Sequence, residues 1–117
     1  MHGLPQDIEL RFFVGSALEQ LCFSEHQVIL KFDRRIVVSV ESEFRLAFEN
    51  VDIRFSNPLV AAAAFVQFLP RRIESVSHRT DGTLTLIFEG AYLFEVFDTS
   101  AVYESYQVHH GEKLTVV

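Results

Sequence analysis

Histidines are the residues of this chain whose chemistry would most readily support a metal site. A structural zinc site needs three or four ligands that converge, usually through short and recognisable spacings. His109 and His110 are adjacent, so on a strand their side chains would point to opposite faces and could not easily share one ion. We therefore expect solvent-exposed histidines, no metal site and no cofactor. The five histidines are His2, His26, His78, His109 and His110.

The nucleophilic and acidic residues form no recognisable catalytic arrangement. Cys22 lies in an apolar stretch, where an unreactive buried thiol is usual. The chain has no Gly-x-Ser-x-Gly elbow, phosphate-binding glycine loop or dinucleotide fingerprint. Glu41 and Glu43 would share one face of a strand, where two carboxylates could bind a cation or act as acid and base. We expect a solvated strand end there and assign no catalytic residue.

One tyrosine-rich segment near the C-terminus allows two interpretations. On a strand, Tyr103 and Ser105 would face one way, and Glu104 and Tyr106 the other. In the first interpretation the aromatic rings complete the core and Glu104 pairs with an arginine. In the second the segment belongs to a contact patch for a partner, because tyrosine is favoured in binding surfaces. That patch would comprise Tyr103, Glu104, Tyr106, Arg71 and Arg72.

The charge balance argues against nucleic acid as a partner. Sixteen acidic residues against ten Lys and Arg give a formal net charge of -6, whereas phosphate binding requires clustered basic residues. The only basic doublets are Arg34-Arg35 and Arg71-Arg72, each beside a predicted turn or helix end. We expect solvated charges at these positions. A contact with an anion or a partner is the alternative.

The hydropathy pattern and the cysteine count bear on location. No apolar run reaches the ~18 residues that a membrane-spanning helix requires, and the N-terminus lacks the basic start and apolar stretch of a secretory signal. The single cysteine allows no internal disulfide and fits a reducing compartment. We therefore expect a cytoplasmic protein with no membrane contact.

The strongest pattern in the chain is an internal repeat of alternating apolar residues. Residues 27–40 align without gaps with residues 83–96, and seven of the eight apolar residues of the first copy meet an apolar residue in the second. The agreement extends to Leu18 against Ile73 and to Phe13 against Phe68. In the turn between strands, Gly90 stands where the first copy has Arg34.

This repeat predicts the fold class. Alternation with a period of two is typical of half-buried strands, and sequential strands usually pair as meanders. We expect a single α+β domain over 1–117, mostly antiparallel, with pseudo-repeated β meanders at about 13–49 and 68–106. The two meanders would form either two packed sheets or one curved sheet. Strands are predicted over 17–23, 28–32, 36–40, 44–48, 84–88, 92–96, 102–108 and 113–117. Residues 50–55 could prolong the strand at 44–48 after a break, and Ile73 and Val76 stand where Leu18 and Leu21 stand in the first copy.

A helix at about 58–69 joins the two copies. Ser56 or Asn57 can cap it, Pro58 suits its first turn, and Pro70 ends it. Its only polar residue is Gln67, whereas a surface helix normally shows a polar stripe. Either the rest of the chain covers this helix, or its outer face meets another subunit. The candidate dimer contacts are Leu59, Phe65 and Phe68.

Several short motifs of the second copy are similar to those of a known protein family. They are Phe68-Leu69, Arg71-Arg72, Asp81-Gly82-Thr83-Leu84, Leu86-Ile87-Phe88, Glu89-Gly90 and Tyr103-Glu104-Ser105-Tyr106. This half of the chain resembles a bacterial family of domains of unknown function, whose C-terminal motif is Tyr-Glu-x-Trp. The chain departs from that family at Tyr106, where Trp is usual, and at Pro70, where Gly is common. The resemblance implies a small β-rich intracellular domain and supplies no catalytic residues.

Two classes of function are compatible with these features. The first is a non-enzymatic protein-interaction domain, binding or immunity-like, that forms a homodimer through the apolar helix or an edge strand. The alternative is an enzyme or small-molecule binder with its site in a cleft between the repeats or at a dimer seam. Converging polar residues with shifted pKa values would favour the second class, and an apolar surface patch would favour the first.

Overall fold

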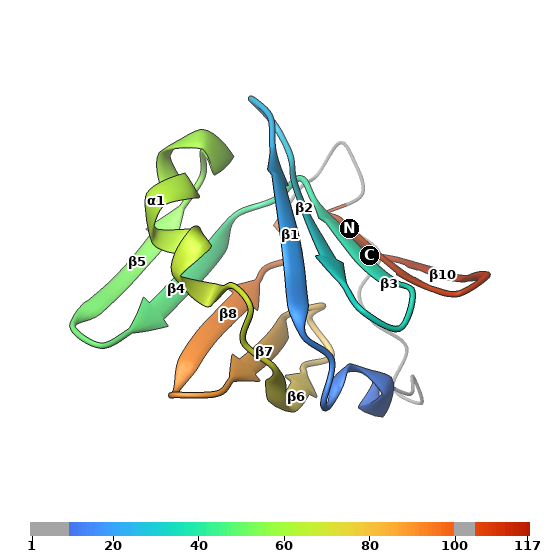
Figure 1. Cartoon of the computed structure of the whole chain (residues 1–117). Helices are drawn as coiled ribbons and strands as arrows, with labels where there is room; N and C mark the ends of the chain where they lie inside the picture. The colour runs from blue at the N-terminus through green and yellow to red at the C-terminus, as the bar shows by residue number, and fades with distance from the viewer. Residues whose placement is uncertain (1–9, 100–104) are drawn as a thin grey trace.

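Two antiparallel β-sheets of five strands each form most of the protein (Figure 1). The computed structural model describes residues 10–99 and 105–117. The strands are β1 Leu18–Phe23, β2 Val28–Phe32, β3 Ile36–Val40, β4 Phe44–Phe48, β5 Val51–Phe55, β6 Ile73–His78, β7 Leu84–Phe88, β8 Tyr92–Val96, β9 Tyr106–His110 and β10 Lys113–Val116. Their orders are β1-β2-β3-β9-β10 and β5-β4-β8-β7-β6. The predicted, mostly antiparallel α+β class is confirmed.

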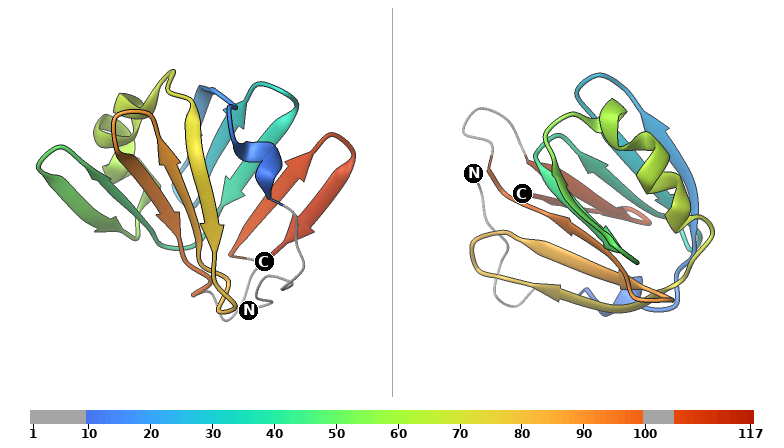
Figure 2. Two further views of the ribbon diagram at one scale, coloured as in Figure 1. Left: turned by 90° about the horizontal axis from the view of Figure 1, so that it is seen from below. Right: turned by 90° about the vertical axis from the view of Figure 1, so that its left-hand side faces the viewer.

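Each repeat gives its first three strands to one sheet and its last hairpin to the other. The β1-β2-β3 meander is followed by the β4-β5 hairpin, which crosses over so that β4 pairs with β8. The β6-β7-β8 meander is likewise followed by the β9-β10 hairpin, in which β9 pairs with β3. Figure 2 shows each hairpin lying alongside the other repeat's meander. Two sheets therefore form, each completed by strands from both repeats.

Equivalent hydrogen bonds join the two repeats where their first strands begin. The Leu18 N–H donates to the carbonyl of Arg71 at 3.0 Å. At the corresponding place, the Ile73 N–H donates to the carbonyl of Ser16 at 2.9 Å. The strand pairs β1-β2 and β6-β7 also break register at matching positions, directly after Leu18 and after Ile73. The repetition is therefore present in the backbone as well as in the apolar pattern.

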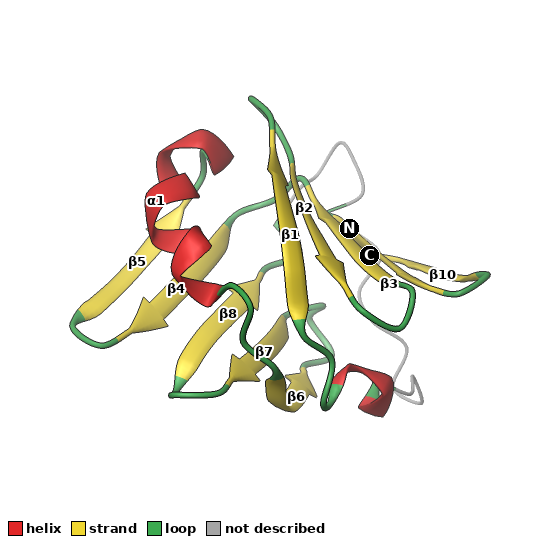
Figure 3. Ribbon diagram, viewed as in Figure 1, coloured by secondary structure: helices red, strands yellow, loops and turns green. Residues whose placement is uncertain are grey.

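The segment that joins the repeats is helical but short and irregular (Figure 3). It consists of a 3₁₀ turn η2 (Pro58–Ala61), one α-helical turn α1 (Ala62–Phe65) and a second 3₁₀ turn η3 (Val66–Phe68). The Asn57 side chain caps it by accepting a hydrogen bond from the Leu59 N–H at 2.9 Å. Of the two capping residues that the sequence offered, Asn57 is the one used. A further 3₁₀ turn, η1 (Arg11–Phe13), precedes β1.

Aromatic rings from both sheets and from the helical segment fill the core. Alternate residues of the central strands are buried, as in β2, where Val28, Leu30 and Phe32 face inward. The ring centres of Phe65 in α1 and Phe44 in β4 are 5.5 Å apart. Because burial of each large apolar side chain contributes roughly 1.5–3 kcal/mol, this cluster is the main source of stability.

The first strand of the C-terminal hairpin ends two residues later than the sequence suggested. β9 runs through His109 and His110, which were expected in the connecting turn, and the turn is instead formed by Gly111 and Glu112. Gly111 adopts a φ of 62°, which the turn requires. The predicted strand start at Val102 lies outside the described residues. Within the described part of the chain, no helix is long and apolar enough to cross a bilayer.

Candidate interaction surface

The structure removes Tyr106 from the expected contact patch. Its side chain is 1% exposed, and its hydroxyl donates a hydrogen bond to the carbonyl of Gly82. Burial, supported by nearby carboxylates, raises the pKa of the Tyr106 phenol well above its usual value. Tyr106 therefore completes the core, as the first interpretation of this segment held. Tyr103 and Glu104 lie outside the described residues.

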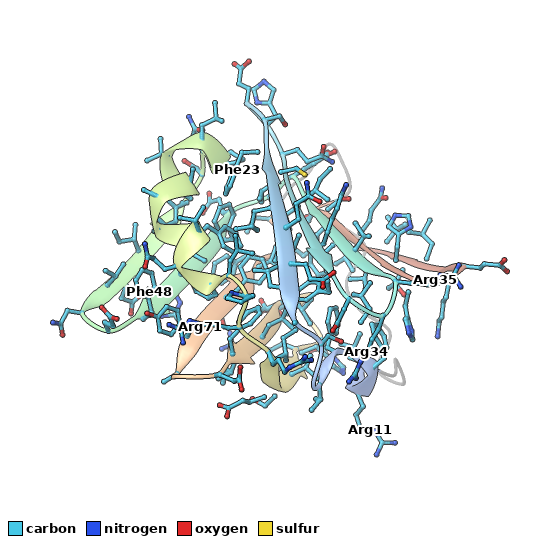
Figure 4. The ribbon with its side chains drawn as sticks, viewed as in Figure 1. Arg11, Phe23, Arg34, Arg35, Phe48 and Arg71 are labelled. Atoms are coloured by element: carbon cyan, nitrogen blue, oxygen red, sulfur yellow. The ribbon has the colours of Figure 1, made fainter. Side chains whose placement is uncertain are left out.

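Arg71 belongs to the junction between the helical segment and the second repeat. Its guanidinium lies 3.6 Å from the centre of the Tyr92 ring. It also donates hydrogen bonds to the carbonyls of Gln67 and Glu89, at 3.2 and 3.1 Å. Figure 4 shows Arg71 beside the end of the helical segment. These contacts hold the Arg71 side chain against its own chain and give it a structural role.

Arg72 and Arg34 lie near the start of β1, whereas the carbonyl of Arg35 accepts a hydrogen bond from the Gly111 N–H at 3.0 Å. Arg72 donates to the carbonyl of Gly15 at 2.7 Å and pairs with Asp33 at 3.5 Å. Arg34 donates to the neighbouring carbonyl of Val14 at 3.3 Å. Figure 4 places Arg34 and Arg35 together at the β2-β3 turn, away from Arg71. The two arginines of the expected patch thus serve different structural contacts and do not converge with Tyr106.

The helical segment buries its aromatic side chains in the core and exposes aliphatic side chains together with Gln67. Phe65 and Phe68, two of the three candidate dimer contacts, are fully buried and do not reach the surface. Leu59, the third, is 51% exposed, and Val60 and Val66 are 69% and 44% exposed. The first alternative, cover by the rest of the chain, therefore holds for only part of this segment, and the contact with another subunit stays a prediction. The chain covers its aromatic side and leaves its aliphatic side open.

The edge strand β5 lies next to the helical segment. Figure 1 shows the helical segment lying over β5 and β4, and residues of β5 contact η2. Ile53 of β5 is opposite Leu46 of β4, so its side chain is on the inner face of the sheet, yet it is 48% exposed. We name this region the α1–β5 surface. It comprises Ile53, Leu59, Val60 and Val66 together with the open edge of β5.

The outer face of β5 carries charges held in a defined arrangement. Asp52 accepts two hydrogen bonds from Nη1 of Arg45, both at 3.0 Å, and Arg54 pairs with Glu43. Arg45 also donates to Glu95 at 3.2 Å. The bond to Asp52 is the largest cause that raises the pKa of the Arg45 guanidinium, and Glu95 adds to it. Carboxylate and guanidinium groups thus alternate across β5, β4 and β8: Asp52, Arg45 and Glu95.

The remaining chemical candidates are dispersed. His26 is in an exposed turn, paired with Glu25 at 3.6 Å, and the His110 ring stacks on Phe12 at 4.1 Å. Among the described residues, no three His, Cys, Asp or Glu side chains are grouped so that they could hold a metal ion. Cys22 on β1 is half-buried. Glu41 and Glu43 do not act together: Glu43 pairs with Arg54, and Glu41 accepts a hydrogen bond from Gln27 at 3.4 Å.

Sequence reasoning missed most of the α1–β5 surface. It selected the aromatic residues of the helical segment, whereas the exposed ones are the aliphatic Val60 and Val66. The alternation of Val51, Ile53 and Phe55 with Asp52 and Arg54 was the available signal for the edge strand.

Comparison of the chain with protein-family models, with curated proteins and with solved structures gave no significant match. The resemblance of the second repeat to a bacterial domain family therefore stays a prediction. The α1–β5 surface, defined by its own geometry, is the candidate functional site.

Proposed function

We propose that this chain is a non-enzymatic protein-interaction domain, binding or immunity-like, which contacts its partner through the α1–β5 surface. The observation that carries the proposal is the exposure of three aliphatic side chains, Leu59, Val60 and Val66, on one short segment without charge, with Val60 the most exposed at 69%. Burial of a branched aliphatic side chain contributes roughly 1.5–3 kcal/mol. Their burial against a partner would therefore contribute to a specific contact.

The position of these side chains supports the proposal further. Single exposed apolar residues are normal, whereas neighbouring ones mark sites of interaction. The helical segment is attached to the core through Phe65 and Phe68, and the core does not need an aliphatic residue at position 60. Because Val60 is 69% exposed, a polar side chain there should cost the fold little, and contact with a partner would explain the apolar residue.

We place this interaction in the cytoplasm. The lone Cys22 is half-buried and has no disulfide partner, and unpaired cysteines are usual in a reducing compartment.

Site-specific photo-crosslinking in cells that produce the protein tests the proposal. A benzophenone amino acid replaces Val60 in one variant and Leu114 in a second. Leu114 is a matched control because it is also exposed, at 49%, but lies on β10. Mass spectrometry then identifies any covalent adduct.

We expect a discrete protein adduct from position 60 and none, or a much weaker one, from position 114. The adduct can contain either another protein or a second copy of this chain. Absence of an adduct at position 60, or equal labelling at both positions, would contradict the proposed function.

A further inference from the structure

We propose that the partner of the α1–β5 surface is a second copy of this chain, bound by antiparallel pairing of the two β5 strands across a two-fold axis. This inference rests on the proposed function and names the partner. It would join the two β5-containing sheets of the two copies into one continuous sheet. The exposed aliphatic side chains of the two helical segments would then lie on the same side of that sheet.

β5 is the sheet edge best suited to such pairing. The edge strands β1 and β6 each contain a break in register, and their starts are joined by a bridge between Ala17 and Arg72. Breaks of this kind protect edges against pairing. β10 begins with Lys113, a residue type that also discourages it. β5 pairs with β4 in unbroken register along its whole length, and no other described strand pairs with it.

The backbone of β5 has the correct direction for this contact. The two-residue turn of Glu49 and Asn50 is closed by the pair Phe48–Val51. In such a hairpin the closing pair exchanges hydrogen bonds, and every second residue then bonds the same neighbour. Val51, Ile53 and Phe55 therefore direct their N–H and carbonyl groups toward β4. The backbone groups of Asp52 and Arg54 face the open edge.

The side chains of β5 are self-complementary in one register. If the two-fold axis passes between the two Ile53 residues, Asp52 of each copy faces Arg54 of the other. Opposite charges in directly opposed positions stabilise an antiparallel pair, and like charges destabilise it. In the same register Val51 faces Phe55, and the two half-exposed Ile53 side chains meet at the centre. The charges and the apolar residues are thus satisfied together.

The contacts already present within one copy prepare these charges. Arg45 orients Asp52, and Glu43 orients Arg54, yet the two side chains remain 65% and 49% exposed. A guanidinium has five N–H donors and a carboxylate accepts several hydrogen bonds, so each can take a second partner. Pairing would therefore produce an uninterrupted series of opposite charges running from one copy into the other.

The five residues of β5 alone would bury too little surface for a stable dimer, and the exposed apolar residues of the helical segment add contact area. Stable dimers bury about 800 Å² on each partner, more than one short strand provides. Leu59, Val60 and Val66 extend the contact beyond the strand on the face that holds Ile53.

The sharpest test uses two charge reversals, Asp52→Arg and Arg54→Asp, measured by sedimentation velocity across a concentration series. In the first variant positions 52 and 54 both carry arginine, and in the second both carry aspartate. Each variant alone would place like charges opposite one another, so we expect a dissociation constant of the dimer at least ~10-fold above that of the unmodified protein. A mixture of the two variants restores opposite charges and should form a heterodimer.

The mixture separates pairing from folding. Each reversal also disrupts one internal ion pair, and that disruption persists in the mixture, so recovery of the dimer can come only from contact between chains. Lys113→Glu at the edge of β10 is the control and should leave the dimer unchanged. Circular dichroism checks that each variant folds. If a charge reversal prevents folding, the neutral variants Asp52→Asn and Arg54→Gln are used instead, and we expect each to lose less affinity than the reversal.

The outcomes distinguish this inference from the proposed function. Dimeric unmodified protein, weakened single variants and a recovered heterodimer would support pairing through β5. An unmodified protein that stays monomeric at every concentration would overturn it, as would a dimer that both reversals leave unchanged. A crosslink from position 60 to a different protein, with no dimer, would overturn only the identity of the partner and leave the proposed function standing.

Discussion

Arg34 and Gly90 occupy equivalent positions in the two repeats and share a left-handed backbone, with φ of 61° and 82°. The residues that follow them, Arg35 and Ala91, both have a φ of 62°. The turns β2-β3 and β7-β8 therefore have the same conformation, although only one has glycine at the position where a side chain is disfavoured. Arg34 adopts this conformation while donating a hydrogen bond to the carbonyl of Val14.

We therefore predict that Arg34→Gly stabilises the protein. Relief of left-handed strain is worth roughly 1–2 kcal/mol, and the greater freedom of glycine in the unfolded chain offsets part of it. The free energy of unfolding in urea should rise by about 0.5–1 kcal/mol. The matched control, Gly90→Ala, should do the reverse, because a side chain at a φ of 82° carries the left-handed strain that glycine avoids. A lower melting temperature for Arg34→Gly would contradict the prediction.

Most strands were predictable because each is specified by its local alternation of apolar residues. Alternation identified Val28–Phe32 and Ile36–Val40 with their observed bounds, and the capping chemistry of Asn57 located the helical segment. The exchange of hairpins between the sheets was not predictable in this way. Alternation along Phe44–Phe48 shows that one face is buried, but it carries no information about which sheet buries it.

The candidate site was less predictable than the fold. An apolar segment without charge indicates that something covers it, but the division between buried and exposed side chains depends on the packing of Phe65 and Phe68 against strands from both repeats. The burial of Tyr106 depends on the distant Gly82 carbonyl. The edge position of β5 depends on strand order. Each is a long-range property that no short sequence window contains.

Gly82 should be the glycine least tolerant of substitution. Its φ is 94°, and a Cβ would lie 2.6 Å from Cβ of Asp98. At Gly111, with a φ of 62°, the nearest atoms of other residues would be 3.9 Å away, in the Arg35 guanidinium. We expect Gly82→Ala to lower the free energy of unfolding by about 3 kcal/mol and Gly111→Ala by about 1 kcal/mol. Equal losses in chemical denaturation would show that the close approach of Asp98 has no energetic weight.

Tyr106 predicts how stability depends on pH in the alkaline range. Because burial raises the pKa of its phenol in the folded state, the folded protein retains a proton that the unfolded chain releases above about pH 10. The contribution of neutral Tyr106 is therefore fully present below pH 10 and decreases as the pH rises further. Urea denaturation should show this decrease in the unmodified protein and a shallower one in Tyr106→Phe.

The same variant should be less stable at neutral pH. Removal of the hydroxyl leaves the carbonyl of Gly82 without this donor, at a cost of about 1–2 kcal/mol. Tyr92→Phe, on the other sheet, is the control for tyrosine removal. A steep alkaline decrease that persists unchanged in Tyr106→Phe would assign it to other groups.

The two faces of the helical segment should respond differently to truncation. Phe68 is fully buried and contacts the rings of Phe48, Phe88 and Tyr92, so Phe68→Ala should cost about 3–5 kcal/mol of unfolding free energy. Val60→Ala, measured at a protein concentration low enough to exclude association, should change it by less than about 0.5 kcal/mol. A loss above 1 kcal/mol from Val60→Ala in that dilute regime would mean that this side chain serves the fold of a single chain, and the α1–β5 surface would then lose its most exposed member.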